Sequence, residues 1–135
     1  MTAPVYAMVI PTEKVGLVRL TFQDDGALAR ISLRAEAVLG ASSGESGSRP
    51  SKAPSVAAVR RWLQDYMVGA AGDFPGPWSN PGRTDFAQRV YAVVAAVPAG
   101  KTMSYGEVAA AAGSSGASRA VGTAMGRNPI PLVVP

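Results

Sequence analysis

The sequence contains neither cysteine nor histidine. Without cysteine the chain can form no disulfide and no thiolate metal site, and without histidine it also lacks the other common zinc ligand. No apolar run approaches the ~20 residues that span a bilayer, and the N-terminus lacks the basic and apolar regions of a secretory signal. We therefore expect a soluble, cytoplasmic protein with no cofactor, no metal and no membrane partner.

Acidic residues are fewer than basic ones, and the excess is uneven. The net charge is +4, and residues 79–135 contain five basic and two acidic residues, against eight and seven in residues 1–78. A basic C-terminal part is compatible with a surface that contacts phosphates. Many small domains without such a partner carry a similar charge, so the charge permits a nucleic-acid partner without identifying one.

The first part of the chain has the pattern of a small antiparallel sheet. Residues 5–10 and 15–22 are rich in β-branched and aromatic side chains, and residues 27–34 alternate apolar with polar ones. These patterns are typical of strands. Asp25-Gly26 favours a turn between the second and the third strand. The sequence therefore predicts a three-stranded meander.

A loop, a helix and a linker are expected next. Residues 40–55 are rich in Gly, Ser and Pro, which predicts a flexible loop. Residues 56–68 place apolar side chains at helical spacing behind Ser55, a good N-cap, and so predict an amphipathic helix. Proline and glycine in residues 69–83 exclude a helix or a central strand. We place the domain boundary there, with Trp78 anchoring the linker in a cleft.

The last part of the chain predicts helices separated by a tight turn. Thr84 can cap a first helix over about 85–96. Ser104 begins an S-x-x-E capping box at the start of a second helix. Residues 113–116, Gly-Ser-Ser-Gly, end that helix, and a third should run over about 117–125. The second and third helices, with the turn between them, have the form of a helix-turn-helix.

Three spaced motifs lie in this part of the chain. They are Ser104-Tyr105-Gly106-Glu107, Arg119-Ala120-Val121-Gly122, and Asn128-Pro129 followed by Pro131 in an apolar tail that ends at Pro135. In order, spacing and residue type they resemble the O6-alkylguanine-DNA alkyltransferases, also called methylated-DNA–protein-cysteine methyltransferases. The resemblance is close from about Thr84 to Pro135, and the layout of the N-terminal part is compatible with it.

The resemblance implies an α+β fold. Residues 1–68 would form a small ribonuclease-H-like domain with a three-stranded antiparallel sheet and a helix, and residues 69–83 a linker. Residues 84–135 would form a mostly helical, winged-helix-like helix-turn-helix DNA-binding domain that is incomplete at its C-terminal end.

The resemblance also implies a chemistry, which is DNA repair by direct reversal. A methyl or larger alkyl group would pass from O6-alkylguanine or O4-alkylthymine to a protein cysteine, after the nucleotide has been flipped out of the duplex. Such a methyltransferase reacts once. Its partner would be double-stranded DNA that carries the lesion, bound through the minor groove. The protein would act as a monomer in the nucleoid, or in the nucleus of a eukaryote.

The matching positions carry over specific roles. Arg119 would be the arginine finger that fills the space left by the flipped nucleotide, and Tyr105 would turn the 3′ phosphate and hydrogen-bond the base. Asn128 would be the hinge between the third helix and the loop that follows. The other residues implied in DNA contact are Ala120, Gly122, Thr123 and Arg127, and those implied at the alkyl pocket are Pro131, Val133 and Val134. Without the resemblance, Arg119 also suits a solvated helix face, and Tyr105 also suits packing on the core.

The alkyl acceptor is missing from the sequence. The family pattern continues Pro-Cys-His-Arg-Val, whereas this sequence ends at Pro135 and has no cysteine. Three interpretations stay open. The chain is an alkyltransferase whose cysteine would follow Pro135, or an alkyltransferase-like protein that has Trp there and binds alkylated DNA without reacting. The third is an inactive truncated product whose apolar surface is left exposed.

Overall fold

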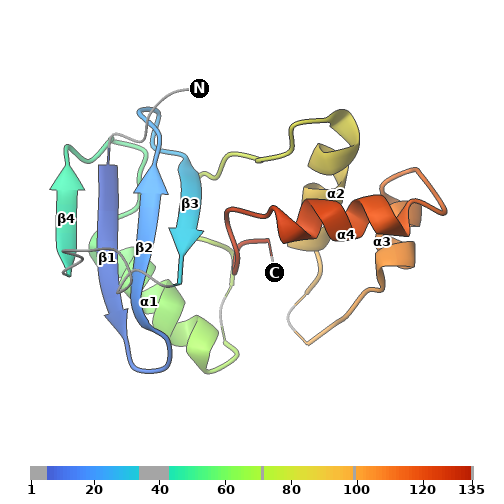
Figure 1. Cartoon of the computed structure of the whole chain (residues 1–135). Coiled ribbons are helices and arrows are strands. Elements are labelled where there is room, and N and C mark those ends of the chain that lie inside the picture. The colour runs from blue at the N-terminus through green and yellow to red at the C-terminus, as the bar shows by residue number, and fades with distance from the viewer. Residues whose placement is uncertain (1–5, 34–42, 71, 99, 135) are drawn as a thin grey trace. The chain divides into compact units, whose positions relative to one another are not determined.

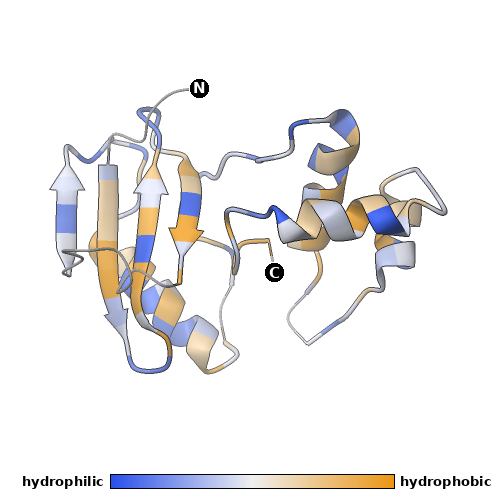
Figure 2. Ribbon diagram, in the orientation of Figure 1, coloured by the Kyte–Doolittle hydropathy of each residue, from blue (hydrophilic) through white to orange (hydrophobic). Residues whose placement is uncertain are grey.

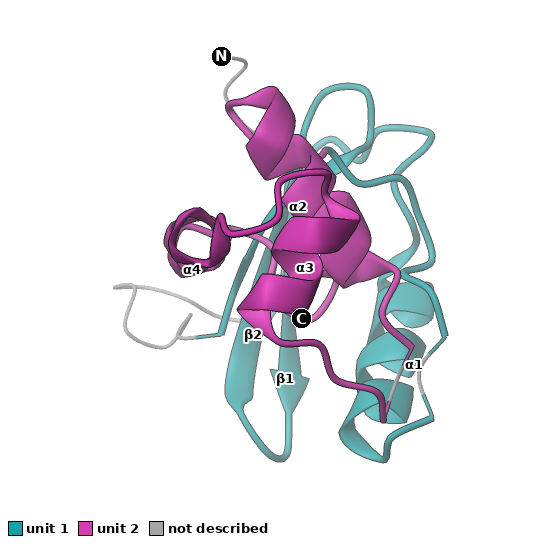
Figure 3. Ribbon diagram, turned by 90° about the vertical axis from the view of Figure 1, so that its right-hand side faces the viewer, with its two compact units in different colours: residues 1–79 teal, residues 80–135 magenta. Residues whose placement is uncertain are grey.

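The computed structural model describes residues 6–33, 43–70, 72–98 and 100–134. The chain divides into two units, residues 1–79 and 80–135, which are coloured teal and magenta in Figure 3. Strands and helices occupy separate parts of the chain, so the fold is α+β, as predicted. Within the described ranges, no helix has the length and apolar character that crossing a bilayer requires.

Unit 1 is built on a four-stranded antiparallel sheet with the strand order β3-β2-β1-β4 (Figure 1). Its strands are β1 (Tyr6–Thr12), β2 (Gly16–Phe22), β3 (Leu28–Ser32) and β4 (Gly44–Gly47). Figure 2 shows polar segments interrupting apolar ones along β2 and β3, as expected for strands with one face in the core.

One face of the sheet packs on helix α1 (Val56–Met67). The hydroxyl of Ser55 accepts a hydrogen bond from the Ala58 N–H at 3.1 Å, which confirms the predicted N-cap. Val59, Trp62 and Leu63 are buried on one side of α1, at the spacing of a helical stripe. The opposing strand residues are the fully buried side chains Met8, Ile10, Val18, Leu20 and Phe22.

Strand β4 corrects two predictions, a flexible loop over residues 40–55 and a sheet of only three strands. Gly44–Gly47 pairs with β1, with Gly47 opposite Tyr6, and the Tyr6 hydroxyl donates to the Glu45 carboxylate. All four residues of β4 are exposed, so backbone hydrogen bonds rather than apolar packing hold the strand, and its composition gives no strand signal. Val5, Arg34 and residues 40–42 of the predicted segments lie outside the described residues.

Aromatic side chains hold residues 72–79 against the rest of unit 1. The Phe74 ring lies 5.1 Å from that of Trp62 and 6.5 Å from that of Phe22, between centroids. The indole N–H of Trp62 donates to the Gly72 carbonyl at 3.2 Å. The backbone around Trp78 pairs with Leu28 in a short parallel bridge, and the Trp78 side chain is half-buried.

Unit 2 contains α2 (Asp85–Ala95), α3 (Tyr105–Ala111) and α4 (Ser118–Gly126). The hydroxyl of Thr84 accepts from the Ala87 N–H at 3.1 Å, which confirms the N-cap predicted for the first of these helices. The three helices bury one small core between them. Its members are Val90, Tyr91, Val94, Val108, Ala109, Ala112, Val121 and Ala124.

Replacing Gly26 with alanine should destabilise unit 1. Gly26 has φ +89°, and a Cβ atom there would lie 2.7 Å from the backbone nitrogen of Ala53. We expect Gly26→Ala to lose about 3 kcal/mol or more of unfolding free energy, because a rigid backbone clash adds to the strain of a positive φ. Gly69→Ala is the matched control, since Gly69 has φ +75° but no neighbour within 4 Å, and it should lose only about 1 kcal/mol.

The measurement is urea unfolding followed by tryptophan fluorescence. Both tryptophans, Trp62 and Trp78, belong to unit 1, so the signal reports on that unit. Equal losses in the two variants would contradict the close approach at Gly26.

Candidate nucleic-acid interface

The N-terminus of α3 is capped by Ser104. Its hydroxyl accepts from the Glu107 N–H and donates to the Glu107 carboxylate, each at 3.1 Å. The serine half of the predicted capping box is confirmed, whereas the Glu107 carboxylate bonds the Ser104 hydroxyl in place of a backbone N–H. Tyr105 is the first residue of α3, and its side chain is 51% exposed.

The turn between α3 and α4 is short and internally bonded. The N–H of Ser114 donates to the Ala109 carbonyl at 2.9 Å, and that of Ala117 to the Ser114 carbonyl at 3.1 Å. Gly113 and Gly116 both have φ +87°, a conformation that other residues adopt only with strain. The second and third predicted helices and the turn between them are therefore confirmed as a helix-turn-helix.

Helix α4 presents one exposed face that combines positive charge with small side chains. Arg119, Thr123 and Arg127 follow one another at intervals of four residues, and Ala120 lies beside them. The two arginines are about 12 Å apart along the helix axis. The Thr123 hydroxyl donates to the Arg119 carbonyl at 3.2 Å, so in this rotamer its proton is not available to a ligand.

Tyr105 lies against α4 at Gly122. A Cβ atom at Gly122 would stand 3.3 Å from Cε2 of the Tyr105 ring, closer than most Cβ contacts. Glycine at this position therefore lets an aromatic side chain of α3 approach the α4 backbone. The structure thus brings Tyr105 and Gly122 together, although they are 17 positions apart in the sequence.

The segment after α4 is held by Asn128. Its amide N–H donates to the Val134 carbonyl at 2.6 Å, and its amide oxygen accepts from the Ile130 N–H at 3.0 Å. The Val134 N–H also donates to the Ile130 carbonyl, and the side chains of Ile130 and Val134 are fully buried. Asn128 therefore ties the end of α4 to the loop that follows it.

Leu132 is strained within this loop. Its φ is +74°, and it is the one residue other than glycine with a positive φ in the described parts of the chain. Such a conformation costs roughly 1–3 kcal/mol and persists only when neighbouring contacts impose it. Pro131 and Val133, on either side, are half-buried, and Pro135 lies outside the described residues.

Two side chains of α2 bond to the helix-turn-helix, and the sequence pattern did not single them out. The buried Tyr91 hydroxyl donates to the Ala124 carbonyl of α4 at 2.5 Å, and Nε of Arg89 donates to the Ala112 carbonyl at 2.8 Å. Burial raises the pKa of the Tyr91 hydroxyl, and the charge of Arg127 opposes that shift. Their acceptors lie 33 and 23 positions away, so no local spacing could indicate them.

The described residues offer no metal site, because no three carboxylate, imidazole or thiol side chains among them come together in a cluster.

Comparison with known proteins identifies the family. Residues 85–135 match the model of the 6-O-methylguanine DNA methyltransferase DNA-binding domain. The Mycobacterium tuberculosis OGT structure in complex with DNA aligns with a TM-score of 0.69 at 31% identity, over 96% of this chain and 74% of that chain. The chain belongs to the methylated-DNA–protein-cysteine methyltransferase family. The Mycobacterium tuberculosis O6-methylguanine methyltransferase structure gives a TM-score of 0.70 at 28% identity, with the same coverage.

Curated members of the methyltransferase family are similar over a shorter stretch. The constitutive enzyme of Bacillus subtilis is 42% identical over 82 residues, which is 61% of this chain and 49% of the relative. The Mycobacterium leprae enzyme is 52% identical over 73 residues, which is 54% of this chain and 44% of the relative. The matched region thus spans about half the length of these relatives.

Tyr91→Phe should cost about 1 kcal/mol of unfolding free energy near neutral pH, the usual net contribution of a buried hydrogen bond. The raised pKa of Tyr91 gives this difference a pH dependence. The wild-type protein keeps the stabilisation from this hydrogen bond below pH ~10, the pKa of tyrosine in the unfolded chain. It loses this stabilisation as the pH rises toward the higher pKa of Tyr91 in the folded protein. Urea unfolding followed by far-ultraviolet circular dichroism at several pH values checks both parts. If the difference in unfolding free energy between wild type and Tyr91→Phe grew above pH ~10, the raised pKa of Tyr91 would be contradicted.

Gly122→Ala and Gly126→Ala test the contact with Tyr105. Helix propensity alone should raise the free energy of unfolding by up to about 0.5–1 kcal/mol in both variants. A Cβ atom at Gly126 would have no neighbour within 4 Å. We expect Gly126→Ala to stabilise the protein and Gly122→Ala to gain less or to lose stability. Thermal unfolding followed by circular dichroism compares them, and equal gains would show that Tyr105 does not press on α4.

Proposed function

We propose that this chain binds double-stranded DNA and recognises O6-alkylguanine, as the lesion-reading part of a direct-reversal repair protein. The observation that carries the proposal is the exposed face of α4, where arginines flank small side chains, with Tyr105 held against Gly122 beside it. Support also comes from the names of the relatives, which are methylated-DNA–protein-cysteine methyltransferases, and from the OGT that was crystallised with DNA.

The small side chains of α4 suit the minor groove. That groove is only about 6 Å wide, so a helix that enters it benefits from residues such as Ala120 and Gly122. A long cationic side chain among them, Arg119, can then reach the base stack. Flipping a nucleotide out costs a few kcal/mol, and Arg119 would offset part of this cost by filling the vacated space.

Tyr105 would act on the flipped nucleotide. Its ring is fixed by Gly122 on one side while half of its surface stays accessible. A phenol is rigid, can press on a phosphate and can donate a hydrogen bond to a base. Arg127 would contribute a phosphate contact, and Thr123 would do so only after its hydroxyl turns away from the Arg119 carbonyl.

Alkyl transfer would use a cysteine thiolate, the reactive form of the side chain. Sulfur would attack the alkyl carbon, the bond from that carbon to O6 of guanine would break, and the electron pair would stay on the base, which then takes up a proton. None of the 135 residues is a cysteine. In the family pattern the cysteine is two positions after Val134, whose backbone Asn128 holds, so this hinge would fix the distance between α4 and the acceptor.

Arg119→Ala should remove the preference for alkylated DNA. We expect wild-type protein to bind a duplex with one O6-methylguanine more tightly than the same duplex with guanine. The variant should lose about tenfold in affinity for the lesion and little for the plain duplex, since a finger that stabilises flipping is worth on the order of 1–3 kcal/mol. Fluorescence anisotropy measures both affinities, and Arg60→Ala on α1 is the control for lost charge. Equal wild-type affinity for both duplexes would overturn the proposed recognition.

Alkyl transfer itself is tested with a chimera. Residues 1–135 are joined to the segment that follows the corresponding proline in the Bacillus subtilis relative. We expect this chimera, incubated with O6-methylguanine DNA, to gain the mass of one methyl group, and the same chimera with its cysteine changed to alanine to gain none. Lesion-specific binding without methyl uptake would favour the alternative, a protein that binds alkylated DNA and does not react.

A further inference from the structure

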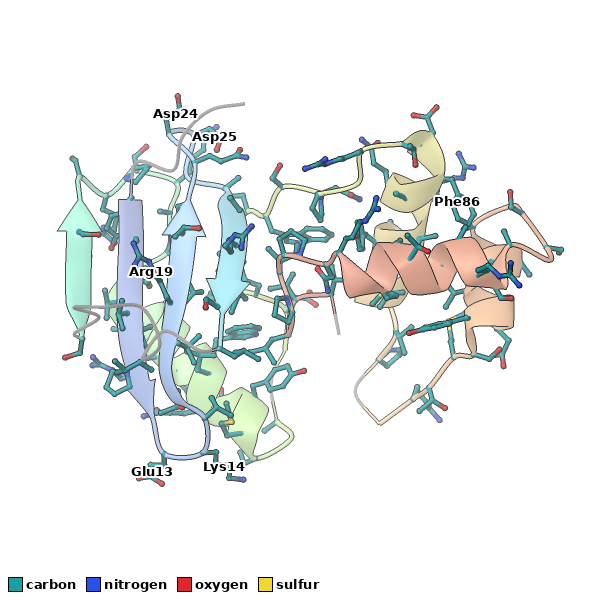
Figure 4. All side chains as sticks on the ribbon, viewed as in Figure 1. Glu13, Lys14, Arg19, Asp24, Asp25 and Phe86 are labelled. Atoms are coloured by element: carbon teal, nitrogen blue, oxygen red, sulfur yellow. The ribbon has the colours of Figure 1, made fainter. Side chains whose placement is uncertain are left out.

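Arg89 is held in place at the end of α3. Its Nε–H donates to the carbonyl of Ala112, the C-cap residue, at 2.8 Å. Its guanidinium also lies 5.9 Å from the ring centroid of Phe86, which is one turn earlier on α2 and is labelled in Figure 4. The carbonyls in the last turn of a helix lack intrahelical donors, so Arg89 supplies one of them.

Most of the guanidinium is left for another partner. An arginine side chain has five N–H donors in a planar fork. Among the hydrogen bonds between described residues, Arg89 contributes only its Nε–H, and the residue is exposed. Four donors of a charged group are therefore available on a side chain whose orientation is already fixed, which lowers the entropy lost when an anion binds.

Arg89 bonds the C-terminal end of α3, next to the turn that leads into α4. Ala112 is followed by the bonded turn 113–117, and Arg119 is the second residue of α4. Proteins that place a helix in a DNA groove commonly fix its register through contacts to the phosphates beside that groove.

We propose that Arg89 is a DNA-phosphate contact pre-positioned by the carbonyl of Ala112. The Nε–H stays on that carbonyl while the outer N–H groups bind a phosphate of the strand next to α4, in a charge-assisted fork. The inference rests on the proposed DNA binding. In this role Arg89 fixes the position of the protein along the DNA backbone, whereas Arg119 fills the space left by the flipped nucleotide.

The test measures how the affinity depends on salt. Each phosphate contact contributes about −0.9 to the slope of log K against log salt concentration on duplex DNA. We expect Arg89→Gln to make the slope shallower by about this amount and to weaken binding roughly fivefold, a typical effect of one exposed charge pair. Both effects should be equal for the plain and the O6-methylguanine duplex. Arg61→Gln, an exposed arginine of α1, removes the same charge and should leave the slope unchanged.

Arg89→Lys separates charge from capping. It should keep a slope near that of the wild type, because the positive charge remains, while thermal unfolding reports any loss of the Ala112 hydrogen bond. If wild-type protein binds DNA and Arg89→Gln lowers the melting temperature with no change in slope, Arg89 is only a helix cap and the inference is wrong. A wild-type protein that does not bind either duplex at low salt would overturn the proposed function as well.

Discussion

Side chains of α2 donate hydrogen bonds to backbone carbonyls near the ends of α3 and α4. Helices of seven and nine residues are too short to be stable alone in water. Arg89 donates to the Ala112 carbonyl, and Tyr91 adds a second donor at the Ala124 carbonyl, which also accepts from the Arg127 N–H. Helix α2 therefore helps to fix how α3 and α4, the two helices of the helix-turn-helix, lie.

The composition of α4 explains why this support matters. The alanines and glycines of α4 deprive it of large side chains for packing, and glycine within a helix costs up to about 1 kcal/mol relative to alanine. A helix composed in this way can keep a fixed position only when other elements hold it. Gly122 has two effects: it lowers the helix propensity of α4, and it allows the close contact with Tyr105.

Local signals in the sequence predicted local structure well. Ser55, Thr84 and Ser104 each cap the helix that follows them, because a cap depends only on neighbours three residues away. Strand β4 was missed because its pairing uses backbone groups and leaves no trace in the Gly-Glu-Ser-Gly composition. The donors to Ala112 and Ala124 and the strain at Leu132 arise from tertiary contacts, which spacing along the chain does not encode. The positions of Arg119, Tyr105 and Asn128 could be placed from motifs, whereas their roles in DNA binding remain proposals.

Strand β4 also changes which strand lies at one edge of the sheet in unit 1. Residues 6–10 of β1, Tyr-Ala-Met-Val-Ile, are uncharged, free of proline and rich in β-forming side chains, the composition of segments that assemble into intermolecular sheets. With β4 in place, β1 is an inner strand and the edge is a short run of glycine, serine and glutamate. A short edge with a charged residue is a poor template for another strand. The polar strand β4 thus covers one edge of β1 and shields this aggregation-prone strand from other chains.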